Sequence, residues 1–82
     1  MTIGVIKMLN EYFREYEAAR KIGRMIKTNI EFSGVPKDTR GMVVDIYPHN
    51  KDNWGVSIQW SLDHKLVDGF SKSEYDQYLE EV

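Results

Sequence analysis

Three aromatic residues and one acid are the side chains of this sequence best suited to binding a ligand. Tyr47, Trp54 and Trp60 fall in the stretch "YPHNKDNWGVSIQW", and Asp68 follows it. An aromatic face attracts a cation, and a carboxylate nearby adds to the attraction. These four residues are therefore the predicted contacts of a ligand site, with Asp68 as the acidic partner.

The spacing of the same residues also favours a structural role for the tryptophans. In residues 54–60 every second residue is apolar: Trp54, Val56, Ile58 and Trp60. Such a face is typical of a buried strand or a subunit interface. In a preceding predicted strand, the alternating apolar residues are Met42, Val44 and Ile46. Tyr47 lies on the opposite face of that strand, so we expect it to be exposed, whereas Asp68 beside Gly69 can equally mark a bulge.

Catalysis and metal binding find little support in the sequence. His49 and His64 are the only histidines, and both fall in predicted turns. A metal site needs three or four converging ligands, and no serine belongs to a nucleophile motif. The sequence has no cysteine to act as a nucleophile or a thiolate ligand. We therefore assign no catalytic residue, no metal and no cofactor.

A basic cluster is the feature that points toward nucleic acid. It consists of Arg20, Lys21, Arg24 and Lys27. Clusters of this kind bind phosphate groups. The formal net charge of −2 argues against a dedicated nucleic-acid binder, and no aromatic motif of RNA-binding domains accompanies the cluster. Nucleic-acid binding is therefore an alternative and not the main prediction.

An amphipathic helix is predicted over residues 4–22, with Gly23 as its C-terminal cap. The residues predicted to form an oligomer interface on its apolar face are Val5, Leu9, Tyr12, Phe13 and Tyr16. This face is too wide for a small domain to cover by itself, and an uncovered apolar surface indicates an interface. We therefore predict self-association as a dimer or tetramer.

The period of the apolar residues changes after the helix. Alternation over residues 26–32, 42–47 and 54–60 predicts three strands, and residues 66–70 a short fourth. Short strands must curl to bury their apolar faces. The predicted fold is therefore mostly β: a small antiparallel barrel of four or five strands within residues 25–70.

The C-terminal segment, residues 71–82, carries a helix signature. Ser71 is followed three residues later by Glu74, which is a capping box. Tyr75, Tyr78 and Leu79 then follow at helical spacing. We expect a short helix or a 3₁₀ turn to end the chain.

Three stretches carry a family resemblance. "GVPKDTRGMVV", "WGVSIQW" and "LVDGFSKSEYDQYL" resemble small bacterial Src-homology-3-like barrels, and the added helix resembles uncharacterised proteins of mobile integron cassettes. The resemblance implies a fold but not an activity, because this barrel hosts many functions. The type II dihydrofolate reductase of this fold carries Val-Gln-Ile-Tyr where this chain has "LVDGF", so none of its residues are transferred.

Length and composition set the remaining expectations. Eighty-two residues predict a single domain over 1–82, and a cysteine-free chain without an apolar run of about 20 residues predicts a cytoplasmic protein with no membrane span. The function that fits best is a non-enzymatic, homo-oligomeric binding module. Its small-molecule ligand would lie in a cleft at a subunit interface or beside the loops 48–53 and 61–65. The alternatives are a nucleic-acid-binding barrel and an enzyme formed at an oligomer pore.

Overall fold

Five antiparallel strands and two short helices make up the computed structural model, which describes residues 11–62 and 67–82. The helices are α2 (Glu15–Lys21) and α3 (Lys72–Tyr78), and the strands are β1 (Met25–Thr28), β2 (Arg40–Pro48), β3 (Trp54–Trp60), β4 (Val67–Phe70) and β5 (Leu79–Glu81). Their order in the sheet is β4-β3-β2-β1-β5. The prediction of a mostly β, antiparallel domain is confirmed.

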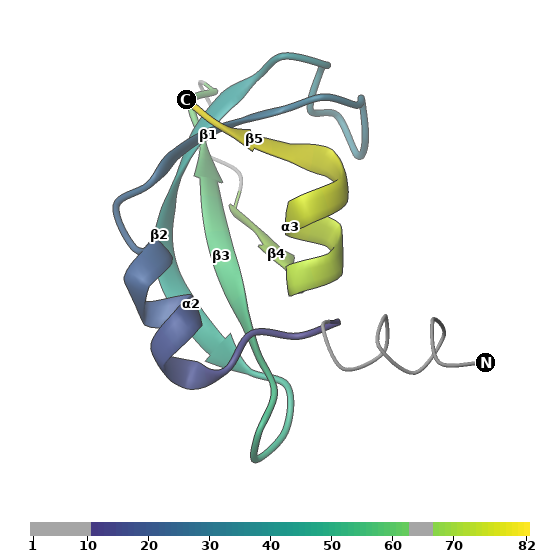
Figure 1. Ribbon diagram of the computed structural model, residues 1–82. Helices are drawn as coiled ribbons and strands as arrows, with labels where there is room; N and C mark the ends of the chain where they lie inside the picture. The colour runs from purple at the N-terminus through teal and green to yellow at the C-terminus, as the bar shows by residue number, and fades with distance from the viewer. Residues whose placement is uncertain (1–10, 63–66) are drawn as a thin grey trace, which may run out of the picture.

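The first four strands form a meander, and α3 then carries the chain from one edge of the sheet to the other (Figure 1). β4 and β5 are the two edges, so the sheet is open. α3 contacts both edge strands, while α2 packs against β2 and β3. The helices therefore stabilise a curved sheet at its edges and at its centre.

One face of the sheet forms the core. The side chains at the centre of it are those of Ile26, Val43, Val56, Ile58 and Trp60, each at most 1% exposed. Around them pack Phe13, Ala18, Val35, Phe70, Tyr75 and Leu79. The alternation predicted for β3 is confirmed at Val56, Ile58 and Trp60, which are buried, whereas Trp54 is only partly buried and Gly55 on the other face is buried as well.

The predicted face of β2 is wrong. Val43 is completely buried, whereas Met42 and Val44 are 40% and 38% exposed. Both faces of this stretch are apolar, so alternation of residue type cannot tell which one points inward. A bulge between Val43 and Asp45 shifts the register with β3 and brings Ile46 onto the core side.

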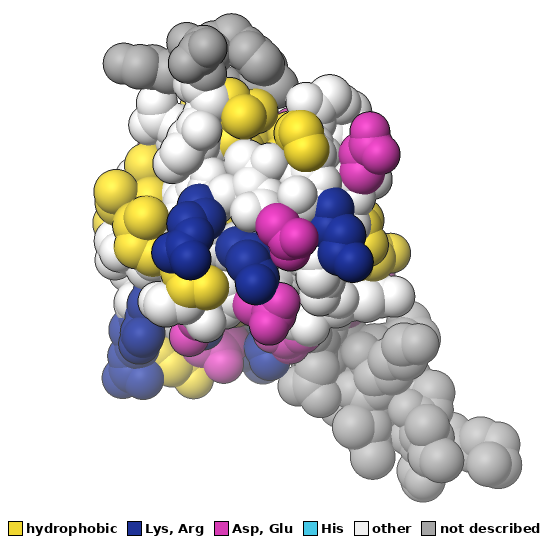
Figure 2. All heavy atoms as spheres, turned by 90° about the horizontal axis from the view of Figure 1, so that it is seen from above, with side chains coloured by type: hydrophobic (Ala, Val, Ile, Leu, Met, Phe, Trp, Pro, Cys, Tyr) yellow, Lys and Arg dark blue, Asp and Glu magenta, His cyan; other side chains and the backbone are white. Residues whose placement is uncertain are grey.

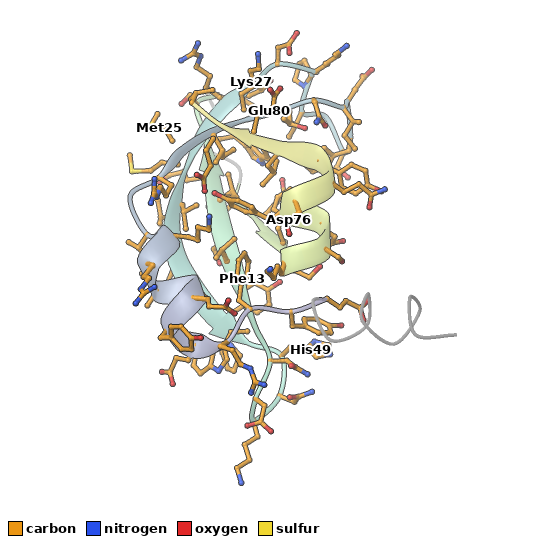
Figure 3. The ribbon with its side chains drawn as sticks, viewed as in Figure 1. Phe13, Met25, Lys27, His49, Asp76 and Glu80 are labelled. Carbon is orange, nitrogen blue, oxygen red and sulfur yellow. The ribbon has the colours of Figure 1, made fainter. Side chains whose placement is uncertain are left out.

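The predicted helix over residues 4–22 is confirmed only in part among the described residues: residues 15–21 are helical and residues 11–14 are not. The helix begins only at Glu15, and Arg14 is its N-cap with extended backbone angles. Phe13 instead pairs with Trp54 as an isolated β-bridge, through two backbone hydrogen bonds of 3.0 and 2.8 Å. Because its ring is 2% exposed, Phe13 belongs to the core of its own chain and not to an exposed helix face (Figure 3).

β1 is shorter than predicted, because it ends at Thr28 and does not continue to Phe32. The Thr28 hydroxyl donates to the carbonyl of Ile30 at 2.8 Å, which turns the chain away from the sheet. A tight turn with positive φ at Ser33 and Gly34 then pairs Phe32 with Val35.

The C-terminal helix is confirmed, but the end of the chain is not helical. The capping box forms as predicted: the Glu74 amide donates to the Ser71 hydroxyl, and the Ser71 amide donates to the Glu74 carboxylate. α3 ends at Tyr78, and Leu79 adopts extended backbone angles. Residues 79–81 form β5, which pairs with β1 and completes the sheet.

Candidate functional site

A groove lies where the β1–β2 connection, β4 and α3 meet. Its lining combines three aromatic rings with two carboxylates, and we call it the acidic–aromatic groove. Its lining residues are Ile30, Phe32, Asp68, Gly69, Phe70, Glu74 and Tyr78. The volume is about 300 Å³, and none of these residues is basic. The groove therefore presents one sign of charge next to apolar surface.

The aromatic wall of the groove is held rigidly by the core behind it. Phe32 meets Phe70 edge to face, with ring centroids 5.7 Å apart, and meets Trp60 at the same distance. Trp60 and Phe70 also pack edge to face, at 6.1 Å. Edge-to-face pairs of this kind are favourable beyond the area that they bury. Phe32, Phe70 and Trp60 thus hold one another in place, so the aromatic wall is preformed without a ligand.

Both carboxylates are oriented by hydrogen bonds through one oxygen only. Oδ2 of Asp68 accepts from the indole nitrogen of Trp60 at 2.8 Å. Oε1 of Glu74 accepts from the backbone amide of Ser71 at 2.8 Å. No donor among the described residues reaches the second oxygen of either group. The acids are therefore positioned, and within the described residues each has one oxygen that accepts no hydrogen bond.

Tyr47 does not line the groove, although it packs over the lining residue Gly69, and it is not the exposed aromatic predicted from its strand. It is partly buried, and its ring crosses β3 to lie over two glycines. A Cβ at Gly55 would meet the Tyr47 hydroxyl at 2.5 Å, and one at Gly69 would meet it at 3.1 Å. Burial raises the pKa of Tyr47, and the nearby charge of Glu74 adds to this effect. The phenol therefore stays protonated and can donate a hydrogen bond.

The structure places the four predicted ligand contacts in different surroundings. Asp68 lines the groove, Trp60 supports its wall from within the core, and Tyr47 does not line it but packs over Gly69. Trp54 does not line the groove, since it pairs with Phe13 at the far end of β3.

Of the residues that line the groove, sequence reasoning predicted only Asp68 as a ligand contact, and the side chains it missed include Phe32, Phe70, Glu74 and Tyr78. The capping box located Glu74 but gave it a structural role only. Phe32 was assigned to a strand that ends earlier, and Tyr78 reaches the groove through the path of α3. Only the tertiary fold brings these segments together.

The predicted basic cluster is divided by the fold. Arg20, Lys21 and Arg24 line a second groove of about 300 Å³ together with Lys72 from α3. Lys27 lies elsewhere, 4.0 Å from Asp38. The carboxylates that line or border this second groove are Glu17, Asp76 and Glu81. Because three acids offset four bases, this groove favours a phosphate ligand only weakly.

Glu81 is the anchor of that charged region. Its carboxylate accepts from Lys21 at 2.5 Å and from the Tyr75 hydroxyl at 2.8 Å, and Arg24 lies 3.9 Å away. The hydrogen bond from Lys21 and then that from Tyr75 hold the pKa of Glu81 below its usual value of 4.5. Glu81 thus ties the last strand to α2 and α3.

A pH dependence follows from this carboxylate. A lowered pKa in the folded state stabilises the fold above the unfolded pKa, and the contribution is lost as the pH falls through the folded pKa. Glu81→Gln should therefore have a lower free energy of unfolding than the wild type at neutral pH. This difference should disappear in acid, below about pH 4.5. Urea unfolding at several pH values measures it, with Glu80→Gln as the control. A difference that persists unchanged in acid would contradict this role for Glu81.

Among the described residues, no group of three or more His, Asp or Glu side chains could hold a metal ion. His49 stacks on Tyr12, with ring centroids 4.5 Å apart and an angle of 16° between the rings (Figure 3). His64 lies outside the described residues, as do Val5 and Leu9 of the predicted interface. Within residues 11–62 and 67–82, no helix is long and apolar enough to cross a membrane.

Comparison with known proteins gives no relative. No protein-family model matches the chain, and neither the curated proteins nor the solved structures contain a significant match.

Proposed function

We propose that the protein is a non-enzymatic binding module whose acidic–aromatic groove takes an organic cation. The ligand would carry a guanidinium or ammonium group on a short apolar stem. The observation that supports this is the lining itself: Phe32, Phe70 and Tyr78 stand beside the carboxylates of Asp68 and Glu74. Rings and carboxylates attract the same positive group, and the rings also cover its stem.

The energetics favour a small and rather weakly bound ligand. A cation over an aromatic ring contributes about 0.5–2 kcal/mol, depending on how far water is excluded. A hydrogen bond between charged groups adds about 1.5–3 kcal/mol. A volume of about 300 Å³ is at the lower end for ligand pockets. We therefore expect affinity to weaken as salt is added, because both carboxylates are near the surface.

We further propose that the open sheet belongs to a Src-homology-3-like barrel, as the resemblance of the sequence implies. In support, a four-strand meander is followed by a helix and a fifth strand that pairs with the first. Such an arrangement curls the sheet on itself. The absence of cysteine is the support for a cytoplasmic location.

The test is a calorimetric titration with agmatine, which joins a guanidinium and an ammonium through an alkyl stem. We expect binding by the wild type, at least tenfold weaker binding by Asp68→Asn or Glu74→Gln, and weaker binding at high salt. Both substitutions keep the acceptor oxygen that the fold uses. Asp52→Asn, which removes the same charge from the exposed turn after β2, is the matched control and should bind as the wild type does.

Two results would overturn the proposal. One is the absence of agmatine binding at low salt. The other is an equal loss of affinity in the control and in the groove variants, because this would show attraction by net charge without a site.

A further inference from the structure

The face of the sheet turned away from the core carries an apolar row that crosses β1 to β4 and ends at Val82, the residue after β5. Cross-strand pairing puts Met25 opposite Met42, Met42 opposite Gln59, and Gln59 opposite Val67, while the amide of Val82 donates to the carbonyl of Met25. The row therefore runs, strand by strand, through Val82, Met25, Met42, Gln59 and Val67. Four of its five members are hydrophobic, and each of those four is at least 40% exposed.

More apolar surface adjoins this row. Val44 is 38% exposed, and a shallow groove of about 240 Å³ lies among Met25, Met42, Val44 and Leu62. Figure 2 shows hydrophobic side chains gathered along its left edge, the side to which Met25 projects in Figure 3. A sheet with one solvated face normally carries polar residues there. A contiguous apolar patch is instead typical of an interface.

The charges beside the row show which partner fits. On β2, Arg40 precedes Met42 by two positions and Asp45 follows it after the bulge. Arg40 shares the face of Met42 by strand alternation, and Asp45 is on this face because it pairs with Ser57 and not with a core position of β3. Both are exposed, and neither forms an ion pair within the described residues. On β2 the apolar row thus has a base on one side and an acid on the other, while the strands beside Arg40 carry Lys27 and Glu80, whose charges are opposite.

We propose that this face is the interface of a homodimer, with a two-fold axis along the apolar row at Met42. Such an axis reverses the strand direction of the second copy. Arg40 of each copy then faces Asp45 of the other, and the apolar rows pack on each other. A surface that is complementary to itself under a two-fold rotation identifies a second copy of the chain as its occupant.

This interface differs from the one predicted on the N-terminal helix. On α2, Tyr16 is the large hydrophobic side chain that stays exposed, and the guanidinium of Arg20 lies over its ring at 5.5 Å. Among the described residues, the sheet face has more exposed apolar side chains than α2 does. The self-association expected from the sequence therefore finds its surface on the sheet, independently of any ligand in the acidic–aromatic groove.

Sedimentation equilibrium over a range of protein concentrations tests the dimer. The wild type should approach twice the chain mass of 9.6 kDa, and Met42→Glu should remain a monomer with an unchanged circular dichroism spectrum. Arg40→Asp and Asp45→Arg should each weaken dimerisation at least tenfold, because like charges then face each other. The double variant exchanges the charges and should restore the dimer.

The controls come from the exposed turn between β2 and β3. Lys51→Asp and Asp52→Arg make the same charge changes away from this face and should leave the dimer intact. A wild type that is monomeric at every concentration, or a double variant no better than the single ones, would overturn the proposal.

Discussion

Trp60→Ala should lower the free energy of unfolding by about 3–5 kcal/mol, which is most of the stability of many small domains. The side chain is 1% exposed and packs edge to face with Phe32 and Phe70. Its removal leaves a cavity that these rings cannot fill without moving. It also takes the indole donor from Asp68, which adds the cost of an unpaired carboxylate oxygen.

Trp54→Ala is the matched control, since the same side chain is removed from the same strand. Trp54 is only partly buried at the end of β3, so its loss should cost less than that of Trp60. Urea unfolding followed by circular dichroism compares the two. If Trp60→Ala does not fold, Trp60→Phe should be intermediate, because it keeps a ring in the core. Equal losses from both tryptophans would contradict the assigned core.

Gly55→Ala should displace the ring of Tyr47 and cost about 1–3 kcal/mol, as overpacking does. The new methyl group would lie 2.5 Å from the phenol oxygen and 2.8 Å from Cε1. Since the obstacle is a side chain and not the backbone, the ring can swing into solvent. It then loses its packing over Gly55 and Gly69.

A double-mutant cycle isolates this contact. With Tyr47→Ala already in place, Gly55→Ala meets no ring and should be close to neutral or slightly stabilising, because glycine weakens a strand. Tyrosine fluorescence and urea unfolding of the four proteins give the coupling energy. Additive effects of the two substitutions would show that the ring does not depend on Gly55.

The features that the sequence predicts well are local ones. The alternation of β3 fixes its buried face because its other face is polar or glycine, and the capping box fixes the start of α3 because both hydrogen bonds join residues three apart. The tryptophans were interpreted chiefly as core residues, and Trp60 is one.

The features that the sequence does not predict depend on contacts between distant segments. Residues 11–14 have a helical pattern, yet Phe13 is drawn into a bridge with Trp54. Leu79 continues a helical spacing, yet β1 offers an edge that extends the sheet. The apolar "GMVV" of β2 can place either of its faces toward the core. The sequence therefore does not predict that Val43 is a core residue or that Met42 belongs to an exposed apolar row.

The candidate site also combines a residue predicted from the sequence with residues that only tertiary contacts bring together. Asp68 was a predicted contact because acid and aromatics are close in sequence. The ring of Phe32 and the carboxylate of Glu74 join it only through a turn at Ser33–Gly34 and the path of α3. A groove made from three separate segments leaves no single motif in the sequence.

The most direct test of the central claim is to map where agmatine binds by backbone amide chemical shifts. The proposal predicts that the shifts concentrate at Phe32, at residues 68–70 and at α3, and that they disappear in Asp68→Asn. Shifts spread over the acidic residues of the whole surface, or centred on the apolar row through Met42, would contradict it.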